Sequence, residues 1–134
     1  MYPDLVLLHK DDFITIRYDK TNNCLVTARQ GYPSVDAVKN SLNKTLGYIQ
    51  QYNCNKIISD MRSIKGTWTA SNEWIGKEWM PKAIAAGLKY VAYVYPPDVF
   101  GQFALQDLIK KNSQYSLQIF KDPQEARSWI LSNR

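Results

Sequence analysis

Hydrophobic and polar residues alternate with a period of two near the start of the chain. Ile14, Ile16 and Tyr18 occupy every second position, and residues 24–29 show the same alternation. A period of two with β-branched side chains is typical of strands. The stretch between them, 19–23, is Asp-Lys-Thr-Asn-Asn, and its Asp and Asn side chains favour a tight turn. The pattern therefore predicts a β-hairpin.

Apolar residues then recur at spacings of three and four, the period of a helix. The pattern starts after Ser34, a natural N-cap residue, and stops at Asn53. The apolar stripe consists of Val35, Val38, Leu42, Leu46 and Ile49. We expect a helix of about five turns that buries one side. Lys56–Met61, which contains two adjacent isoleucines, predicts a buried strand after it.

A tryptophan-rich segment follows this strand. Thr69 or Ser71 is expected to cap a helix that ends at Gly87. The apolar flank of this helix would be Trp74, Ile75, Trp79, Ala83 and Ile84. Pro81 lies inside the pattern, and proline has no N–H to donate to the preceding turn. We therefore expect the helix to kink or break just before Pro81.

Strands and helices alternate in the last third of the chain. Lys89–Tyr95 and Ser116–Phe120 are the expected strands. Asp98 is expected to cap the helix between them, and Asp122, ahead of a proline and a glutamate, to cap the terminal helix. The predicted apolar faces are Phe100, Phe103, Ala104 and Leu108 in the first helix, and Ala126, Trp129 and Ile130 in the second. Both phenylalanines are expected in the core.

The resulting order is ββαβαβαβα. Strands that alternate with helices imply right-handed crossovers and a largely parallel sheet. We expect an α/β fold whose mixed, mostly parallel sheet has four or five strands, an N-terminal hairpin and about four helices. The apolar run Leu5–Leu8 is expected to be a short edge strand or a packed arm. No repeat or linker divides the chain, so residues 1–134 are expected to form a single domain.

Composition narrows the classes of function. Hydrophobic residues make up 45% of the chain, too many for a disordered protein. The net charge is +5, but no run of Lys or Arg exceeds the pair Lys110-Lys111, so no nucleic-acid surface is expected. The longest apolar run falls far short of the roughly 20 residues that span a bilayer. We expect a cytoplasmic protein in which Cys24 and Cys54 stay reduced.

Residues with catalytic or metal-binding potential are few. His9 is the only histidine, and no nucleophile motif accompanies it. A zinc site needs about four ligands, and His9, Cys24 and Cys54 lack the spacing of such a set. The glycines form no phosphate-binding loop. The expectation is a protein that is not an enzyme and holds no metal or cofactor.

The most unusual feature is a cluster of three tryptophans close to charged residues. The cluster comprises Asp60, Arg62, Lys65, Trp68, Trp74 and Trp79. Trp74 and Trp79 are five residues apart, so on a helix they point roughly 140° from each other. We expect one of them to face the sheet and the other to lie with Trp68 near the carboxyl end of the preceding strand, where open α/β sheets bind ligands. Alternatively, Trp68 and Trp79 merely cover the sheet, and Asp60 and Arg62 form a local salt bridge.

The element order and the closing segment Ile119–Leu131 resemble the SpoIIAA-like fold of STAS domains, which is related to the lipid-binding domain of Sec14-like (CRAL-TRIO) proteins. In small bacterial SpoIIAA-like proteins a strand ending in Phe also precedes an acid-capped helix with Glu-Ala and Trp-Leu. At the level of topology the resemblance covers nearly the whole chain. At the level of sequence motif it covers only this closing segment. Anti-sigma-factor antagonists of the STAS class carry a phosphorylatable serine in an Asp-Ser-Ser-Gly-like turn. Residues 59–63 do not reproduce that turn, although Ser63 would be the positional counterpart.

Two functions follow as expectations. The first, which the resemblance implies, is a non-catalytic regulatory or protein-interaction module that binds a protein partner or a second copy of the chain. Its site would be Asp60, Arg62, Ser63 and Lys65 with the three tryptophans. The alternative is a carrier or sensor of a small apolar, anionic or lipid-like ligand. A closed apolar pocket beside the tryptophan-bearing helix would favour the carrier, and a flat exposed tryptophan patch would favour the interaction module.

Overall fold

Six strands form one mixed sheet in the computed structural model, which describes residues 5–111 and 116–133. The strands are β1 (Leu5–Lys10), β2 (Ile14–Asp19), β3 (Cys24–Gly31), β4 (Lys56–Ile64), β5 (Tyr90–Val94) and β6 (Ser116–Phe120). The first three pair antiparallel, and β3 to β6 pair parallel. The predicted α/β class and mixed sheet are confirmed. The sheet has one strand more than predicted because the run Leu5–Leu8 belongs to an edge strand.

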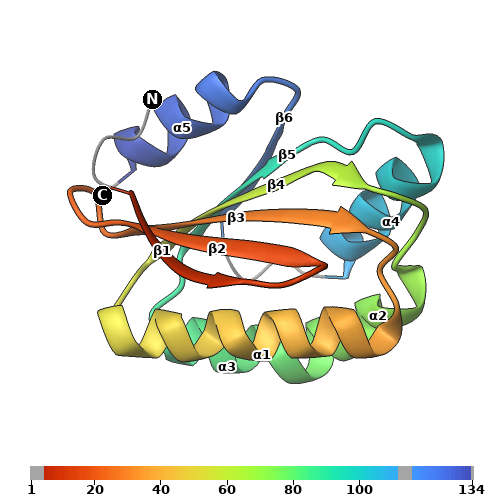
Figure 1. The fold of residues 1–134 in the computed structure, drawn as a ribbon, viewed down its shortest axis with the longest axis horizontal. Coiled ribbons are helices and arrows are strands. Elements are labelled where there is room, and N and C mark those ends of the chain that lie inside the picture. The colour runs from red at the N-terminus through yellow and green to blue at the C-terminus, as the bar shows by residue number, and fades with distance from the viewer. Residues whose placement is uncertain (1–4, 112–115, 134) are drawn as a thin grey trace.

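The strands lie in the sheet in the same order as in the sequence. The helical segments are α1 (Val35–Tyr52), α2 (Thr69–Trp74), η1 (Ile75–Trp79), α3 (Met80–Ala85), α4 (Val99–Lys110) and α5 (Pro123–Ser132). Crossovers between parallel strands are right-handed. When each crossover leads to the neighbouring strand on the same side of the last one, the crossover helices all lie on the same face of the sheet. Figure 1 shows this arrangement, with α1 to α4 on one side of the sheet and α5 on the other. None of the helices among the described residues is both long and apolar enough to cross a bilayer.

Side chains cap the helices α1, α4 and α5 as predicted. Ser34 Oγ accepts a hydrogen bond from the N–H of Ala37, and Asn53 ends α1 in the left-handed conformation at φ 52°. Asp98 caps α4, and Asp122 caps α5. Each cap accepts from one of the main-chain N–H groups that have no partner inside the helix.

The predicted caps Thr69 and Ser71 are wrong for the tryptophan-bearing helix. The cap position is Trp68, which makes no side-chain cap bond. Thr67 Oγ1 accepts from the N–H of Thr69, and the carbonyl of Trp68 accepts from the N–H of Ser71. The helix therefore starts earlier than predicted because a threonine outside it satisfies its first N–H group.

The irregularity expected before Pro81 takes the form of a π-helical turn, not of a break. The N–H of Met80 donates to the carbonyl of Ile75, five residues earlier, so η1 joins α2 to α3 without interruption. Pro81 has no N–H for the bond that an α-helix would require at this point. π-Helical turns are rare and occur frequently at functional sites.

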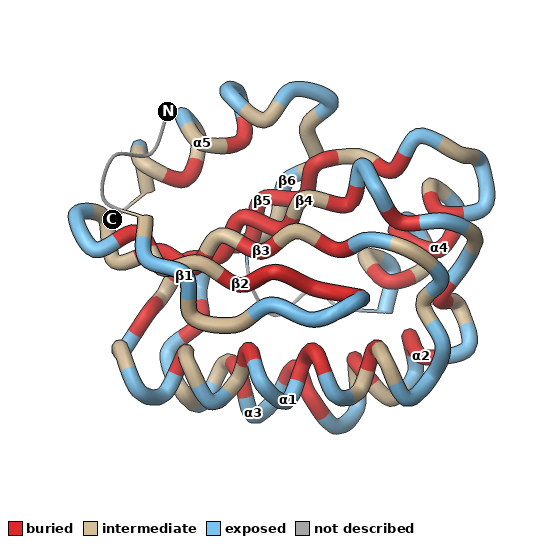
Figure 2. Tube along the Cα trace, viewed as in Figure 1, coloured by how far each residue is buried: buried red, intermediate tan, exposed pale blue. Residues whose placement is uncertain are grey.

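The larger part of the core lies between the sheet and the α1–α4 layer, where Figure 2 shows buried positions on the strands and on the sides of the helices that face them. A smaller cluster, which includes Ala92, Val94, Ala126 and Ile130, lies between the sheet and α5. The predicted core positions Phe100 and Phe103 are wrong, because each side chain is 65% exposed. α4 buries Ala104 and Leu108 as predicted, together with Gly101 and Leu105. The buried stripe therefore overlaps the predicted one and is rotated from it by roughly 75°.

Candidate functional site

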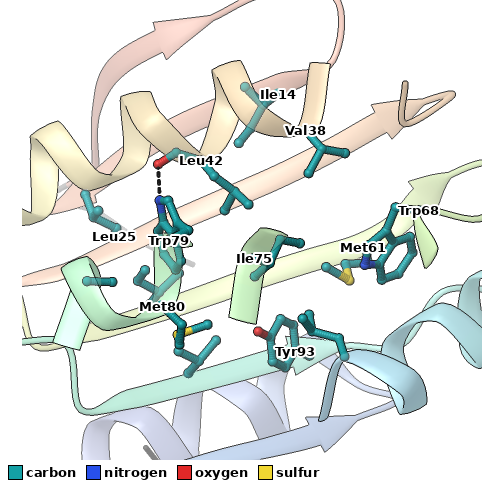
Figure 3. Close-up of a cluster of buried hydrophobic side chains, with 14 of the residues drawn as sticks. Ile14, Leu25, Val38, Leu42, Met61, Trp68, Ile75, Trp79, Met80 and Tyr93 are labelled. Carbon is teal, nitrogen blue, oxygen red and sulfur yellow. Dashed lines mark hydrogen bonds between the residues drawn. The ribbon is translucent and has the colours of Figure 1, made fainter. Parts of the chain in front are cut away.

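A cavity of about 50 Å³ lies between the sheet and the helical layer. Its apolar walls include Val38 and Leu42 from α1, Ile75 and Trp79 from η1, and Trp68 from the loop before α2. Figure 3 shows Ile75 between the indoles of Trp68 and Trp79. Both indoles are 4% exposed. The tryptophan-bearing segment thus forms one wall of an internal, mostly apolar space.

Polar side chains line the sheet side of this cavity. Thr27, Ser59 and Tyr93 stand in register on β3, β4 and β5 and point to the same face. Thr27 Oγ1 donates to the carbonyl of Ile58 at 3.3 Å. The buried faces of parallel strands are ordinarily runs of aliphatic residues. A row of three hydroxyl side chains across the central strands therefore differs from this ordinary composition, and packing of the core alone does not require it.

Arg29 is the charged member of this polar group. It is 8% exposed, and its Nη1 donates to Ser59 Oγ at 2.9 Å. The register between β3 and β4 shifts here, so that Met61 and Arg62 together stand opposite Arg29. A bulge of this kind changes the direction in which a side chain points, and bulges are common beside functional sites. Between residues 5 and 111 and between 116 and 133, no carboxylate forms an ion pair with Arg29.

Burial changes the acid–base behaviour of Arg29. Loss of hydration lowers the pKa of its guanidinium from 12.5 to about 10, and the neighbouring Tyr93 works in the opposite direction. At neutral pH the group therefore still carries its charge. A buried charge without a counterion is costly, and a guanidinium offers a planar set of donors that fits carboxylate oxygens. The cavity can accordingly attract an anion with an apolar body.

The structure separates the three tryptophans differently from the prediction. Trp79 faces the sheet, and its Nε1–H donates to the carbonyl of Leu42 at 2.6 Å. Trp74 is half-buried, with Lys39 Nζ 5.4 Å from the ring centre. Trp79 is buried and Trp74 only partly so, and Trp74 packs against the edge of the same core cluster. The expected pairing of Trp68 with the outward-facing tryptophan is wrong, because Trp68 lines the cavity together with Trp79.

The charged residues of the predicted cluster lie away from the cavity. Asp60 follows Ile58 by two positions, and Ile58 packs on the α5 side of the sheet, so Asp60 belongs to that opposite face. Arg62 Nη2 lies 2.8 Å from Asp60 Oδ2, and this hydrogen bond raises the pKa of Arg62. Ser63 and Lys65 are exposed at the end of β4 and beyond it. The local salt bridge is thus observed, and the predicted seven-residue site is divided between two faces of the sheet.

The strand order leaves the described sheet without the reversal at which open α/β sheets form their ligand crevices. Ligand crevices in open α/β sheets occur where the strand order reverses and adjacent helices leave on opposite faces. Here the order never reverses. The expected ligand position near the end of β4 therefore lacks this topological basis, although Met61, Ile64 and Trp68 from that end line the cavity under the helical layer.

Other groups with potential chemistry are separate from one another. His9 Nε2 lies 2.7 Å from Asp11 Oδ2 next to the edge strand β1. Cys24 and Cys54 are both free and buried. In the part of the chain that the structure describes, no three His, Cys, Asp or Glu side chains come together as metal ligands do.

Reasoning from the sequence missed Arg29. The signal was present, since Leu25, Thr27 and Arg29 occupy alternate positions of one strand and therefore share a face. The opposite face, Cys24, Val26 and Ala28, is the more apolar of the two, so the alternation does not indicate that the face of Arg29 is buried. Only the position of α1 over β2 and β3 decides it (Figure 1).

Comparison with known proteins adds no relative. No protein-family model matches the chain, and no curated protein matches it. The likeness to SpoIIAA-like and STAS domains stays an expectation drawn from the sequence.

Proposed function

We propose that this protein is a small-molecule-binding domain, a carrier or sensor whose ligand occupies the cavity between the sheet and the helices α1 and η1. The observation that carries the proposal is the cavity itself, with apolar walls that include Trp68 and Trp79 and with Arg29 on its sheet side. Apolar walls with a few converging polar groups are typical of ligand sites. Because Trp68 and Trp79 are buried, they form no exposed patch for a protein partner.

The volume of the cavity limits the ligand. An apolar cavity of about 150 Å³ holds a molecule the size of benzene, and sites for drug-sized ligands measure roughly 300–1,000 Å³. The cavity here measures about 50 Å³. It fits a ligand of a few heavy atoms. A lipid-like ligand would require the helical layer to move away from the sheet.

The helical wall is built in a way that favours such movement. It consists of the two six-residue helices α2 and α3 joined through the π-helical η1. The π-helical turn and Pro81 interrupt the regular α-helical hydrogen bonds in the middle of this continuous segment, and helices bend at such points. This supports ligand entry through a small shift of α2, η1 and α3 against α1.

Xenon is the probe that tests for an accessible apolar cavity without assuming a ligand. We expect xenon to shift the indole N–H signals of Trp68 and Trp79 in two-dimensional NMR spectra. Val38→Ile adds a methylene group to the cavity wall and should weaken these shifts. Val94→Ile makes the same change on the α5 side and should leave them intact. If no signal from a cavity-lining residue responds to xenon, the proposal is wrong.

A regulatory or protein-interaction role is the second candidate, and α4 provides the observation for it. Val99, Phe100 and Phe103 are 65–68% exposed. Large apolar side chains grouped on a surface mark interaction sites. We expect the double variant Phe100→Ser/Phe103→Ser to reduce self-association of the protein in sedimentation velocity, with Gln106→Ser on the same helix as the matched control. A wild-type protein that stays monomeric at high concentration would argue against association through this helix.

A further inference from the structure

One charge faces the cavity. Among the described residues that line it, Arg29 alone carries a charge. A guanidinium has five N–H donors, and the described part of the chain provides Arg29 with a single hydrogen-bond acceptor, Ser59 Oγ. That acceptor is neutral. The cavity therefore holds a net positive charge for which the described residues provide no counterion.

Ser59 is placed to share an anion with Arg29. Its Oγ accepts the bond from Arg29 Nη1, which leaves its own O–H as a donor. Ser59 also lies in the middle of the row Thr27–Ser59–Tyr93. A guanidinium and a hydroxyl side by side can each donate to one oxygen of a planar carboxylate.

The charge and size of the site decide between classes of anion. A phosphate group carries about −1.5 to −2 charges at neutral pH, and the single guanidinium offers one. A carboxylate matches this charge and the planar donor set. The volume of about 50 Å³ leaves room for only a few carbon atoms beside the carboxylate. The apolar walls would bury those carbons against Ile75 and the indoles of Trp68 and Trp79.

We propose that the cavity binds a short-chain monocarboxylate, with its carboxylate on Arg29 and Ser59 and its alkyl part against Ile75, Trp68 and Trp79. This inference rests on the proposed function and names the class of ligand for the same site. It assigns the buried arginine a role that folding does not require, since an apolar side chain at this position would avoid the cost of removing a charge from water.

The test compares propionate with propionamide, a neutral molecule of nearly the same shape. Each is titrated into the full-length labelled protein at constant ionic strength, and the indole N–H signals of Trp68 and Trp79 and the Nε–H signal of Arg29 are followed. We expect saturable shifts with propionate and an affinity at least tenfold higher than for propionamide. Sodium chloride serves as a third titrant. Equal shifts with chloride would show that any small anion suffices and would overturn the alkyl part of the proposal.

Variants of Arg29 and Ser59 test whether these two residues cause the preference for propionate. Arg29→Met should abolish the preference for propionate over propionamide, whereas Arg62→Met, which removes an arginine on the opposite face, should preserve it. Ser59→Ala should weaken propionate binding about ten- to a hundredfold, by loss of one hydrogen bond to a charged group. This second variant keeps the test decisive if Arg29→Met does not fold.

The outcomes separate this inference from the proposed function. Equal affinities for propionate and propionamide, with xenon also bound, would overturn the carboxylate assignment and leave a site for neutral ligands. No response to propionate, propionamide or xenon would overturn both.

Discussion

The indole Nε1–H of Trp79 donates a hydrogen bond of 2.6 Å to the main-chain carbonyl of Leu42, 37 residues earlier in the chain. The bond connects η1 to α1 at the wall of the cavity, as Figure 3 shows. Both groups are buried, so loss of either would leave its partner without a hydrogen bond and without water. Trp79 thus fills space and also fixes the position of two helical segments relative to each other.

Trp79 and Trp74 should therefore differ strongly in their effect on stability. We expect Trp79→Ala to lower the free energy of unfolding by about 3–5 kcal/mol, because it creates a large cavity and removes the bond to Leu42. Trp74→Ala should lower the free energy of unfolding by much less. Trp74 is only half-buried, and its contact with Lys39 is worth about 0.5–1 kcal/mol at an exposed site. Urea unfolding followed by circular dichroism measures both. Equal and large losses would show that both side chains belong to the core.

Replacement of Arg29 should not destabilise the protein. Arg29→Met removes a buried charge that has no ionic partner among the described residues, so we expect the free energy of unfolding to stay the same or to rise by about 1–4 kcal/mol. Arg62→Met is the control and should lower the free energy of unfolding by no more than about 1 kcal/mol, because the side chain of Arg62 is about half exposed and Asp60 keeps some contact with water. A substantial loss of stability in Arg29→Met would mean that the arginine is needed for folding and is not reserved for a ligand.

Both cysteines should be protected from thiol reagents in the folded protein. Burial raises the pKa of Cys24 to about 12 and that of Cys54 to about 11. The thiolate is the reactive form, and at pH 8 it is scarce at both positions. We expect almost no reaction with Ellman's reagent at pH 8 in buffer and two reactive thiols per chain in 6 M guanidinium chloride. Rapid reaction of one thiol in buffer would contradict the buried placement of that residue.

Asp98 should make the stability of α4 sensitive to acid. Its carboxylate accepts from the N–H of Gly101 at 2.8 Å and from the N–H of Gly66 at 3.3 Å. The bond from Gly101, aided by that from Gly66, lowers the pKa of Asp98 below its usual 3.8. The ionised form is thus favoured in the folded state, and its contribution is complete above pH 3.8 and is lost as the pH falls through the lower folded value.

Asp98→Ala tests this contribution. The variant should lower the free energy of unfolding by about 1 kcal/mol at pH 7, because the cap of α4 is lost. The difference from wild type should shrink as the pH falls below 3.8. Asp98→Asn retains a cap acceptor and should lose less stability at pH 7. Thermal unfolding at a series of pH values measures these differences. A difference that persists unchanged at low pH would show that the carboxylate charge is not involved.

Local signals explain which parts of the fold could be predicted. The caps Ser34, Asp98 and Asp122 and the stop at Asn53 depend on residues within one turn of the helix end, so the sequence displays them directly. The alternation in β2 and β3 is equally local. These features set the element order, and with right-handed crossovers they set the architecture.

The site could not be predicted in the same way because its residues come from distant segments. Trp68 was expected beside Asp60 and Arg62, yet β4 continues to Ile64 and the alternation of the strand turns Asp60 to the opposite face. Phe100 and Phe103 were assigned to the core because the period of a helix fixes spacing but not rotation. Arg29 lies on the more polar of the two faces of its strand, so its burial does not follow from the alternation. In each case tertiary contacts, which the local pattern does not contain, decide the outcome.

The order in which strands join the sheet has a consequence for synthesis on the ribosome. Every strand after the first pairs with the strand made immediately before it. Each newly emerged strand can therefore cover the open edge left by its predecessor, without waiting for a distant segment of the chain. Exposed edges invite pairing with other molecules, and nascent chains carry this hazard for as long as translation lasts. We expect the protein to assemble its sheet from β1 towards β6 during translation, with the walls of the cavity complete only once α4 has emerged.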